Sequence, residues 1–259
     1  MVKDIILETR HLRRTFGALV AVADVTLQVR TQSLHSIIGP NGAGKTTFFN
    51  LLSGNITPSS GQVLFKGQDI TRLPLYKTAH LGIGRSFQIT NLFPNLTVLE
   101  NIRLACQALG GDNFRFFRSH HAFRQYTARA EEVIEQVGLA GQAYDLARTL
   151  PHGAQRKLEL GIILAPDPEL LLLDEPTAGM ASEQVPELMA LIQQIQAAGE
   201  KTVMLVEHNM NVVMSVSDTI TVMHQGSVLA EGTPTEIAAN ETVQTAYLGQ
   251  LYGEAVGER

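Results

Sequence analysis

Cysteine is nearly absent from this chain of 259 residues, since Cys106 is its only one. A single thiol excludes an intramolecular disulfide and a metal cluster built from cysteines, as is usual in a reducing compartment. The chain also lacks any apolar run near the roughly 20 residues that cross a bilayer. Its N-terminus carries charges early and lacks the apolar stretch of a signal peptide. We therefore expect a cytoplasmic protein whose contact with a membrane is peripheral.

An excess of basic residues is absent too. The chain has 20 lysines and arginines against 25 aspartates and glutamates, which gives a formal net charge of −5. This balance offers no general attraction for phosphate backbones, so no nucleic-acid partner is expected. Apolar residues make up 44% of the sequence, which suits a packed core. The length predicts one elaborated domain covering residues 1–259.

Short β-branched and apolar runs alternate with helical patterns along most of the chain. Runs typical of strands occupy residues 5–7, 20–29, 34–38, 63–65, 170–173, 202–206 and 219–224. Helical spacing of apolar residues occupies residues 45–52, 183–198 and 209–216. The alternation predicts an α/β fold with a largely parallel sheet covered by helices. The first three of these strands are expected to be antiparallel.

The pattern changes between residues 91 and 165, where no strand signal occurs. Helical spacing at residues 98–109, 122–137 and 153–164 predicts a helical subdomain at 91–165, inserted into a core lobe of residues 1–90 and 166–259. Within it, Gly110 to Tyr126 mixes phenylalanines and arginines with the pair His120-His121. Three interpretations of that stretch stay open: a surface loop, a docking patch for a membrane partner, or a histidine metal site.

A glycine-rich segment between the expected strand at residues 34–38 and the expected helix at 45–52 matches the G-x-x-x-x-G-K-[ST] phosphate-binding loop. Glycines let backbone N–H groups turn toward the phosphates, and the helix directs its positive end at them. Lys45 would neutralise the β- and γ-phosphates, and the Thr46 hydroxyl would bind Mg²⁺. The predicted phosphate-binding set is Gly39, Pro40, Asn41, Gly42, Ala43, Gly44, Lys45, Thr46 and Thr47.

Two acidic residues follow the apolar run at residues 170–173. Asp174 ends this expected strand, where it would hold Mg²⁺ beside the nucleotide, directly or through a water. Glu175 comes next and would orient or deprotonate a water in line with the γ-phosphate. Together with the glycine-rich segment, these residues predict a nucleotide and Mg²⁺ as cofactors and hydrolysis as the reaction.

These residues resemble the ATP-binding-cassette (ABC) family, whose ATPases drive membrane transporters. Phe16 matches the aromatic residue that stacks on adenine, Gln88 the glutamine that senses the γ-phosphate and Mg²⁺, and His208 the switch histidine. The implied fold is a P-loop NTPase with an N-terminal antiparallel β subdomain and an inserted α-helical subdomain. The implied site residues are, for catalysis, Glu175, His208 and Gln88, and for Mg²⁺, Thr46, Gln88 and Asp174.

Two segments depart from the family pattern. The family signature is Leu-Ser-Gly-Gly-Gln, whereas residues 150–154 carry Pro151 in place of the serine and Ala154 in place of the glutamine. Pro151 also lacks an N–H donor. Ala181 stands in the loop after Glu175, where aspartate is usual. Because the signature serves the nucleotide of the opposite subunit, the resemblance implies a second, non-identical ATPase subunit and two unequal sites.

Four places are similar in detail to subunits of bacterial importers for branched-chain and other hydrophobic amino acids. They are residues 14–17 with 20–22, 83–88, 206–210, and 230–234 with the ending 246–249. The resemblance implies two integral membrane permease subunits at the cytoplasmic face of the inner membrane and, indirectly, a periplasmic or extracellular substrate-binding protein. A urea or short-amide importer stays open as an alternative, because His152-Gly153 is similar to its subunits.

Two other classes fit less well. A soluble ABC-type ATPase of DNA repair or of the ribosome usually has two cassettes or long coiled-coil arms, whereas this chain has one cassette and no heptad run. A P-loop kinase would need an arginine-rich lid, and a GTPase an Asn-Lys-x-Asp element that reads guanine. The sequence contains neither feature.

Overall fold

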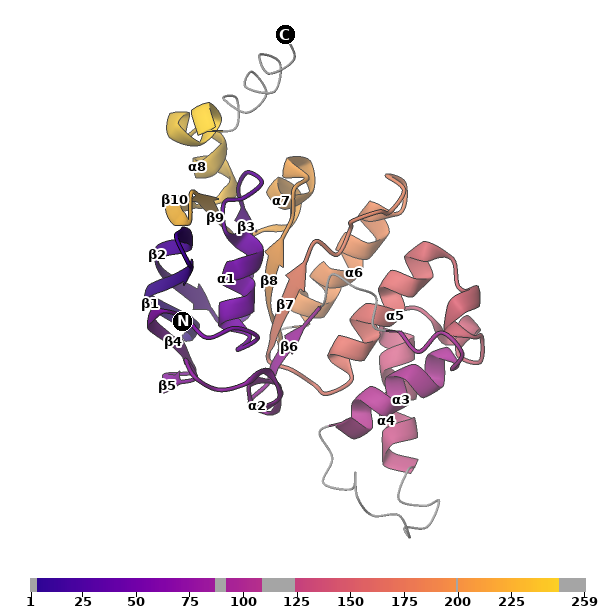
Figure 1. Cartoon of the computed structure of the whole chain (residues 1–259). Coiled ribbons are helices and arrows are strands. Elements are labelled where there is room, and N and C mark those ends of the chain that lie inside the picture. The colour runs from indigo at the N-terminus through magenta and orange to yellow at the C-terminus, as the bar shows by residue number, and fades with distance from the viewer. Residues whose placement is uncertain (1–3, 87–91, 109–123, 199, 247–259) are drawn as a thin grey trace.

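The fold is a mixed sheet flanked by helices, with a further group of helices at one side (Figure 1). The computed structural model describes residues 4–86, 92–108, 124–198 and 200–246. Within these residues, the sheet has 10 strands in the order β5-β4-β1-β2-β10-β9-β3-β8-β7-β6. The predicted α/β class is confirmed.

One end of the sheet is antiparallel. β1 (Ile5–Phe16) pairs with β2 (Leu19–Arg30) on one side and with β4 (Ser60–Phe65) on the other, and β5 (Gln68–Asp69) extends β4. Buried and exposed residues alternate along the second half of β2. This alternation is typical of a sheet that turns one face to the core and the other to solvent.

The other end of the sheet is mostly parallel. β3 (Leu34–Ile38) lies between β8 (Thr202–Val206) and β9 (Thr219–His224), while β7 (Leu170–Asp174) joins β8 to β6 (Ile83–Arg85), and these pairs are all parallel. Every residue of β3, β7 and β8 is buried, which explains their unbroken apolar runs. The prediction of three antiparallel N-terminal strands is wrong for the third, β3. β3 does not pair with β1 or β2 but lies at the centre of the parallel half.

The two halves are joined by β10 (Ser227–Gly232), which the sequence did not predict. β10 is antiparallel to β9 and contacts β2 in parallel through the single pair Ser227 and Asp24. The short strands β5 and β6 were also not predicted. Neither is long enough to show an alternating pattern.

The predicted core helices form close to their expected bounds. Helix α1 (Lys45–Leu52) follows the phosphate loop, and its Phe48 and Phe49 are fully buried. The side chain of Asn209 accepts from the N–H groups of Asn211 and Val212, which fixes the start of α7. The core helices are α1 (Lys45–Leu52), α6 (Val185–Ala197) and α7 (Met210–Val216), with α2 (Leu75–His80) and α8 (Pro234–Ala238) as unpredicted short additions.

The three predicted helices of the inserted region form α3 (Val98–Ala108), α4 (Arg124–Gln136) and α5 (His152–Leu164). They pack on one another to one side of the sheet (Figure 1). Gly161 permits the close approach of α5, because a Cβ there would lie 2.9 Å from the Cδ1 atom of Ile102. Residues 109–123, most of the unusual Gly110 to Tyr126 stretch, lie outside the described residues. Among the helices of the described ranges, none is long and apolar enough to cross a membrane.

Candidate functional site

The predicted phosphate loop connects the end of β3 to α1. Gly39 and Gly44 have φ angles of 153° and 98°. A Cβ on Gly39 would lie 2.2 Å from the carbonyl oxygen of Met223, and one on Gly44 would lie 2.3 Å from that of Ala21. Only glycine fits such contacts in this backbone region. The glycines are therefore required by the packing of the loop against β9 and β2.

The N-terminus of α1 provides donors for an anion. Its N-cap residue is Gly44, which has no side chain to cap the helix. The first N–H groups of a helix lack partners within the helix, and the helix dipole places positive charge at this end. Thr46 and Thr47 lie in this first turn and are partly buried. The arrangement suits the phosphates of a nucleotide.

Lys45 is buried and folds back over the loop. Its Nζ atom donates to the carbonyl oxygens of Gly39 at 2.7 Å and of Pro40 at 3.0 Å. Burial lowers the pKa of Lys45, while Glu175 and Asp174 oppose that shift. The ammonium group is held at the place where phosphate charge is expected, with the two carboxylates close enough to act on it electrostatically.

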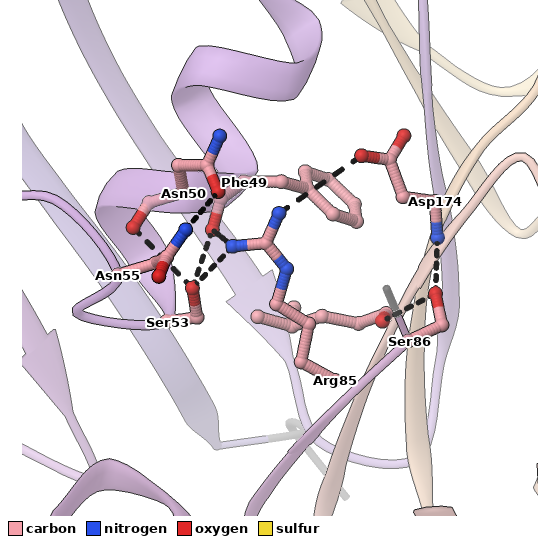
Figure 2. A network of polar contacts seen from close by, with 8 residues as sticks. Phe49, Asn50, Ser53, Asn55, Arg85, Ser86 and Asp174 are labelled. Atoms are coloured by element: carbon pink, nitrogen blue, oxygen red, sulfur yellow. Dashed lines mark hydrogen bonds and ion pairs between the residues drawn. The ribbon is translucent and has the colours of Figure 1, made fainter. Parts of the chain in front are cut away.

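Asp174 ends β7 with both carboxylate oxygens buried and without a hydrogen-bond partner. Figure 2 shows its surroundings: the backbone N–H of Asp174 donates to Oγ of Ser86 at 2.8 Å, and Nη2 of Arg85 lies 4.0 Å from Oδ2. Burial raises the pKa of Asp174, and the Arg85 charge lowers it. A buried carboxylate with both oxygens unbound fits a hydrated divalent cation, which takes oxygen ligands and usually keeps several waters.

Glu175 and His208 lie in direct contact. Oε1 of Glu175 and Nε2 of His208 are 2.7 Å apart. The backbone of Glu175 has a φ of 50°, in the left-handed region that is unfavourable for most residues, and its N–H donates to the Val206 carbonyl. This bond holds the turn against the end of β8. The predicted site residues Lys45, Asp174, Glu175 and His208 are therefore brought together.

Glu207 is a further member of this site that was not predicted to act. Its buried carboxylate accepts from the N–H of Thr177 at 3.0 Å and from its hydroxyl at 2.6 Å, and also from the N–H of His208 at 3.2 Å. It thereby ties the loop after β7 to the residue that contacts Glu175. The signal was available in the sequence, because Glu207 directly follows the buried strand β8, just as Glu175 follows β7.

Phe16 and Gln88 complete the predicted set. Phe16 ends β1 and is 44% exposed, with the guanidinium of Arg14 4.5 Å above its ring. A cation therefore covers one face of this ring. Gln88 lies outside the described residues.

The segment that departs from the family signature begins α5. Pro151 is the N-cap residue and offers no side-chain cap. His152 lies beside the loop after β7, because a Cβ on Gly179 would lie 3.7 Å from the Cε1 atom of His152. From the next turn, Arg156 donates to the carbonyl of Ala178 at 2.8 Å. The start of α5 and the loop containing Ala181 therefore form one continuous surface.

A phosphate loop that links the end of a parallel strand to a helix, with a buried aspartate ending another strand of the parallel half, defines a P-loop nucleotide-binding protein. The chain belongs to the ABC transporter family, which it matches over residues 22–178. It is an ABC ATPase. A second match, over residues 227–250, is to the branched-chain amino acid ATP-binding cassette transporter family.

Similar sequences and structures agree with this membership. The chain is 41% identical to the high-affinity branched-chain amino acid transport ATP-binding protein BraF of Pseudomonas aeruginosa, over 95% of this chain and 98% of BraF. It is 40% identical to LivG of Escherichia coli, with the same coverage. The ADP conformation of the ATP-binding cassette MJ1267 superposes with a TM-score of 0.82 at 27% identity, over 95% of this chain and 99% of MJ1267.

Proposed function

We propose that the chain is the ATP-hydrolysing subunit of an importer for branched-chain or other hydrophobic amino acids. The observation that carries the proposal is the match of residues 227–250 to a family specific to branched-chain amino acid cassettes. Identity to BraF and LivG is 41% and 40%. By contrast, identity to the lipopolysaccharide export protein LptB of Haemophilus influenzae is 30%. Membership of the ABC family alone would leave the cargo open.

The phosphate loop and Lys45 are proposed to bind the phosphates of ATP, with Phe16 against the adenine. For adenine to stack on Phe16, the Arg14 guanidinium must either stay on the opposite face of the ring or move away from it. Thr46, Asp174 and Gln88 are proposed to hold Mg²⁺, and the unbound oxygens of Asp174 support this assignment. The metal would neutralise phosphate charge and organise nearby waters.

Glu175 is proposed to orient and deprotonate the attacking water, and His208 to bind the γ-phosphate. Their contact supports a shared role: the imidazole holds the Glu175 carboxylate at one oxygen and leaves the second oxygen for the water. Glu207 would keep His208 in place through the backbone bond described above. The backbone bond to Glu207 therefore positions His208, and the Glu175 carboxylate is the group that its imidazole contacts.

The membrane partner is proposed to dock in an apolar groove between the sheet and the helical region of residues 91–165. The groove has a volume of about 370 Å³. Tyr76, on α2 at its wall, is 62% exposed although it is large and aromatic. We propose that a cytoplasmic segment of one of the two integral membrane permease subunits fills the groove. Its lining includes Leu75, Tyr76, Ala79, Ile83, Ile162 and Pro168.

The second ATPase subunit is proposed to be non-identical. Pro151 and Ala154 remove the hydroxyl and amide that the signature would offer to a nucleotide across the interface, and Ala181 removes a carboxylate from the neighbouring loop. Lys45, Asp174, Glu175 and His208 nevertheless form a full set on this chain's own side. A partner with an intact signature would complete the site on this chain.

The test is to tag the chain in its native host, solubilise the membranes in mild detergent, and identify stoichiometric partners by mass spectrometry. We expect a second ATPase, two integral membrane proteins at the cytoplasmic face of the inner membrane, and an associated amino-acid-binding protein. Uptake of labelled leucine, with labelled urea as the matched alternative cargo, then names the substrate. Recovery of the chain alone, or with nucleic-acid machinery, would refute the transport assignment.

A further inference from the structure

Arg85 connects the phosphate-loop helix to Asp174. Its Nη1 atom donates to the carbonyl oxygen of Phe49 at 3.2 Å and to Oγ of Ser53, both at the C-terminal end of α1, while Nη2 faces Asp174 at 4.0 Å (Figure 2). The side chains of Arg85 and Asp174 are only 6% and 1% exposed. A cation and an anion are therefore buried together beside the proposed metal site.

The distance between the two groups is informative. At 4.0 Å the pair attracts electrostatically but is too long for a hydrogen bond, so both oxygens of Asp174 stay without a partner. A free arginine would normally close onto a carboxylate in a two-pronged contact. Here the guanidinium is held back by the Phe49 carbonyl and the Ser53 hydroxyl at the C-terminal end of α1, the negative end of that helix.

We propose that Arg85 is a resident counter-ion for Asp174, which balances the buried carboxylate in the metal-free chain without occupying the oxygens that a metal needs. The inference rests on the proposed role of Asp174 in holding Mg²⁺. Because Arg85 is anchored to α1, it remains close when a metal binds, and its positive charge then opposes that of the metal. Arg85 is a positioning residue that stabilises the empty site and weakens metal affinity.

Two variants shift metal affinity in opposite directions under this proposal. Arg85→Met removes the charge, so Mn²⁺ should bind the ADP complex about tenfold more tightly, while the metal-free chain melts roughly 10 °C lower because a buried carboxylate is left uncompensated. Ser53→Ala removes one anchor and lets the guanidinium approach Asp174. We expect Mn²⁺ to bind this variant about threefold more weakly.

Two control variants separate charge from shape. Arg85→Lys keeps the charge, so its affinity for Mn²⁺ should stay within twofold of the original chain. Arg103→Met breaks an ion pair with Glu100 on α3, away from Asp174, and should change neither metal affinity nor ADP binding. Mn²⁺ binding is followed by electron paramagnetic resonance at saturating ADP, and ADP affinity without metal is measured by calorimetry in EDTA.

Tighter Mn²⁺ binding by Arg85→Met together with weaker binding by Ser53→Ala supports the counter-ion role. Weaker binding by Arg85→Met would instead mean that Arg85 aligns Asp174 for the metal, and this would overturn the proposal. If Arg85→Met does not fold, unchanged affinity in Ser53→Ala also overturns it. A different pair of results would refute the proposed function: no ATP hydrolysis by the chain purified together with its partner ATPase subunit, or no effect of Mn²⁺ on ADP binding. Both are measured on the original chain before any variant is compared.

Discussion

The Nε2 atom of His208 lies 2.7 Å from Oε1 of Glu175, although 33 residues separate them in the sequence. They meet because β7 and β8 are adjacent and parallel, with Asp174 opposite Val206 in the register. The residues that leave the two strands therefore emerge at the same edge of the sheet. Strand order brings the two residues to the same edge, and the left-handed backbone of Glu175 completes the turn there.

Glu175→Gln should lower the rate of ATP hydrolysis by about 10²–10³-fold, because the amide cannot take a proton from water. ATP affinity should change by less than about threefold, since the phosphate contacts proposed for Lys45 and α1 do not involve Glu175. Phosphate release and calorimetry measure the two quantities, and Glu169→Gln, in an exposed ion pair with Lys66, is the control. Normal turnover at this chain's own site would remove Glu175 from the mechanism.

Glu207→Gln and Thr177→Val should each lower kcat about tenfold, because each weakens a hydrogen bond to a charged group that positions His208. The double variant should be little worse than either single one, since the residues act as a unit. Thr177→Ser keeps the hydroxyl and should retain most activity. Additive losses, or a change in ATP affinity with kcat preserved, would contradict this link.

Lys45→Met should weaken ATP binding by at least about 100-fold while leaving the nucleotide-free chain equally stable or more so. The ammonium group is buried against carbonyl oxygens, and an apolar replacement of similar length removes its desolvation cost. Calorimetry and urea unfolding report the two effects separately. A marked loss of stability would show that Lys45 serves the loop more than the ligand.

Two glycines of the phosphate loop should respond differently to alanine. The Cβ that Gly44→Ala adds would lie 2.3 Å from the Ala21 carbonyl oxygen, and the backbone φ of 98° is unfavourable for alanine. The free energy of unfolding should therefore fall by at least about 3 kcal/mol. Gly42 has a φ of 78° but open space around it, and Gly42→Ala should cost only about 1 kcal/mol. Urea unfolding of both variants tests this difference, and equal losses would contradict the packing argument.

His35 should make the fold sensitive to acid. Burial lowers its pKa from 6.5 to about 4, and its Nε2 atom lies 2.8 Å from Oγ1 of Thr221. Between these values the unfolded chain binds the extra proton, so stability is present above pH 6.5 and is lost as the pH falls toward 4. Over this window the original chain should lose up to about 3 kcal/mol more than His35→Gln, which cannot titrate.

Urea unfolding at several pH values from 7 to 4 measures this dependence. His11→Gln is the control for the substitution itself, because the side chain of His11 is 81% exposed. A His35→Gln variant with the original slope would place the acid sensitivity elsewhere.

Periodicity and motifs were sufficient for the central strands and helices. The bounds of β3, β8, β9 and α1 agree with the expected runs, because buried strands and a motif-bound helix leave strong local signals. β6 gave no strand signal in the sequence, since it has only 3 residues and includes Gly84. That glycine is there for a tertiary reason: a Cβ would lie 2.9 Å from Ile163 and from Pro168.

The residues of the candidate site likewise fall into those that the sequence predicted and those that only the fold revealed. Lys45, Asp174 and Glu175 were predicted because each belongs to a motif that is contiguous in the sequence. The nearness of Arg85 to Asp174 depends instead on the pairing of β6 with β7, and the contact of Glu207 with Thr177 depends on the turn after β7. The position of Glu207 directly after β8 places it near this edge of the sheet, but spacing along the chain does not show which residues these side chains contact. The two contacts became visible only in the fold.

The groove beside β6 shares part of its wall with the surroundings of Asp174, because Arg85 and Ser86 belong to both. Under the proposed docking, Arg85 and Ser86 would serve the membrane partner and the nucleotide site at the same time. Leu75, Tyr76 and Ile162 line the groove without that second duty. A related chain that adapts to a new permease is therefore expected to change residues of α2 and α5 first and to keep Arg85 and Ser86. Sequence differences in the lining of this groove would then reflect a change of partner, while the chemistry of the nucleotide site stays the same.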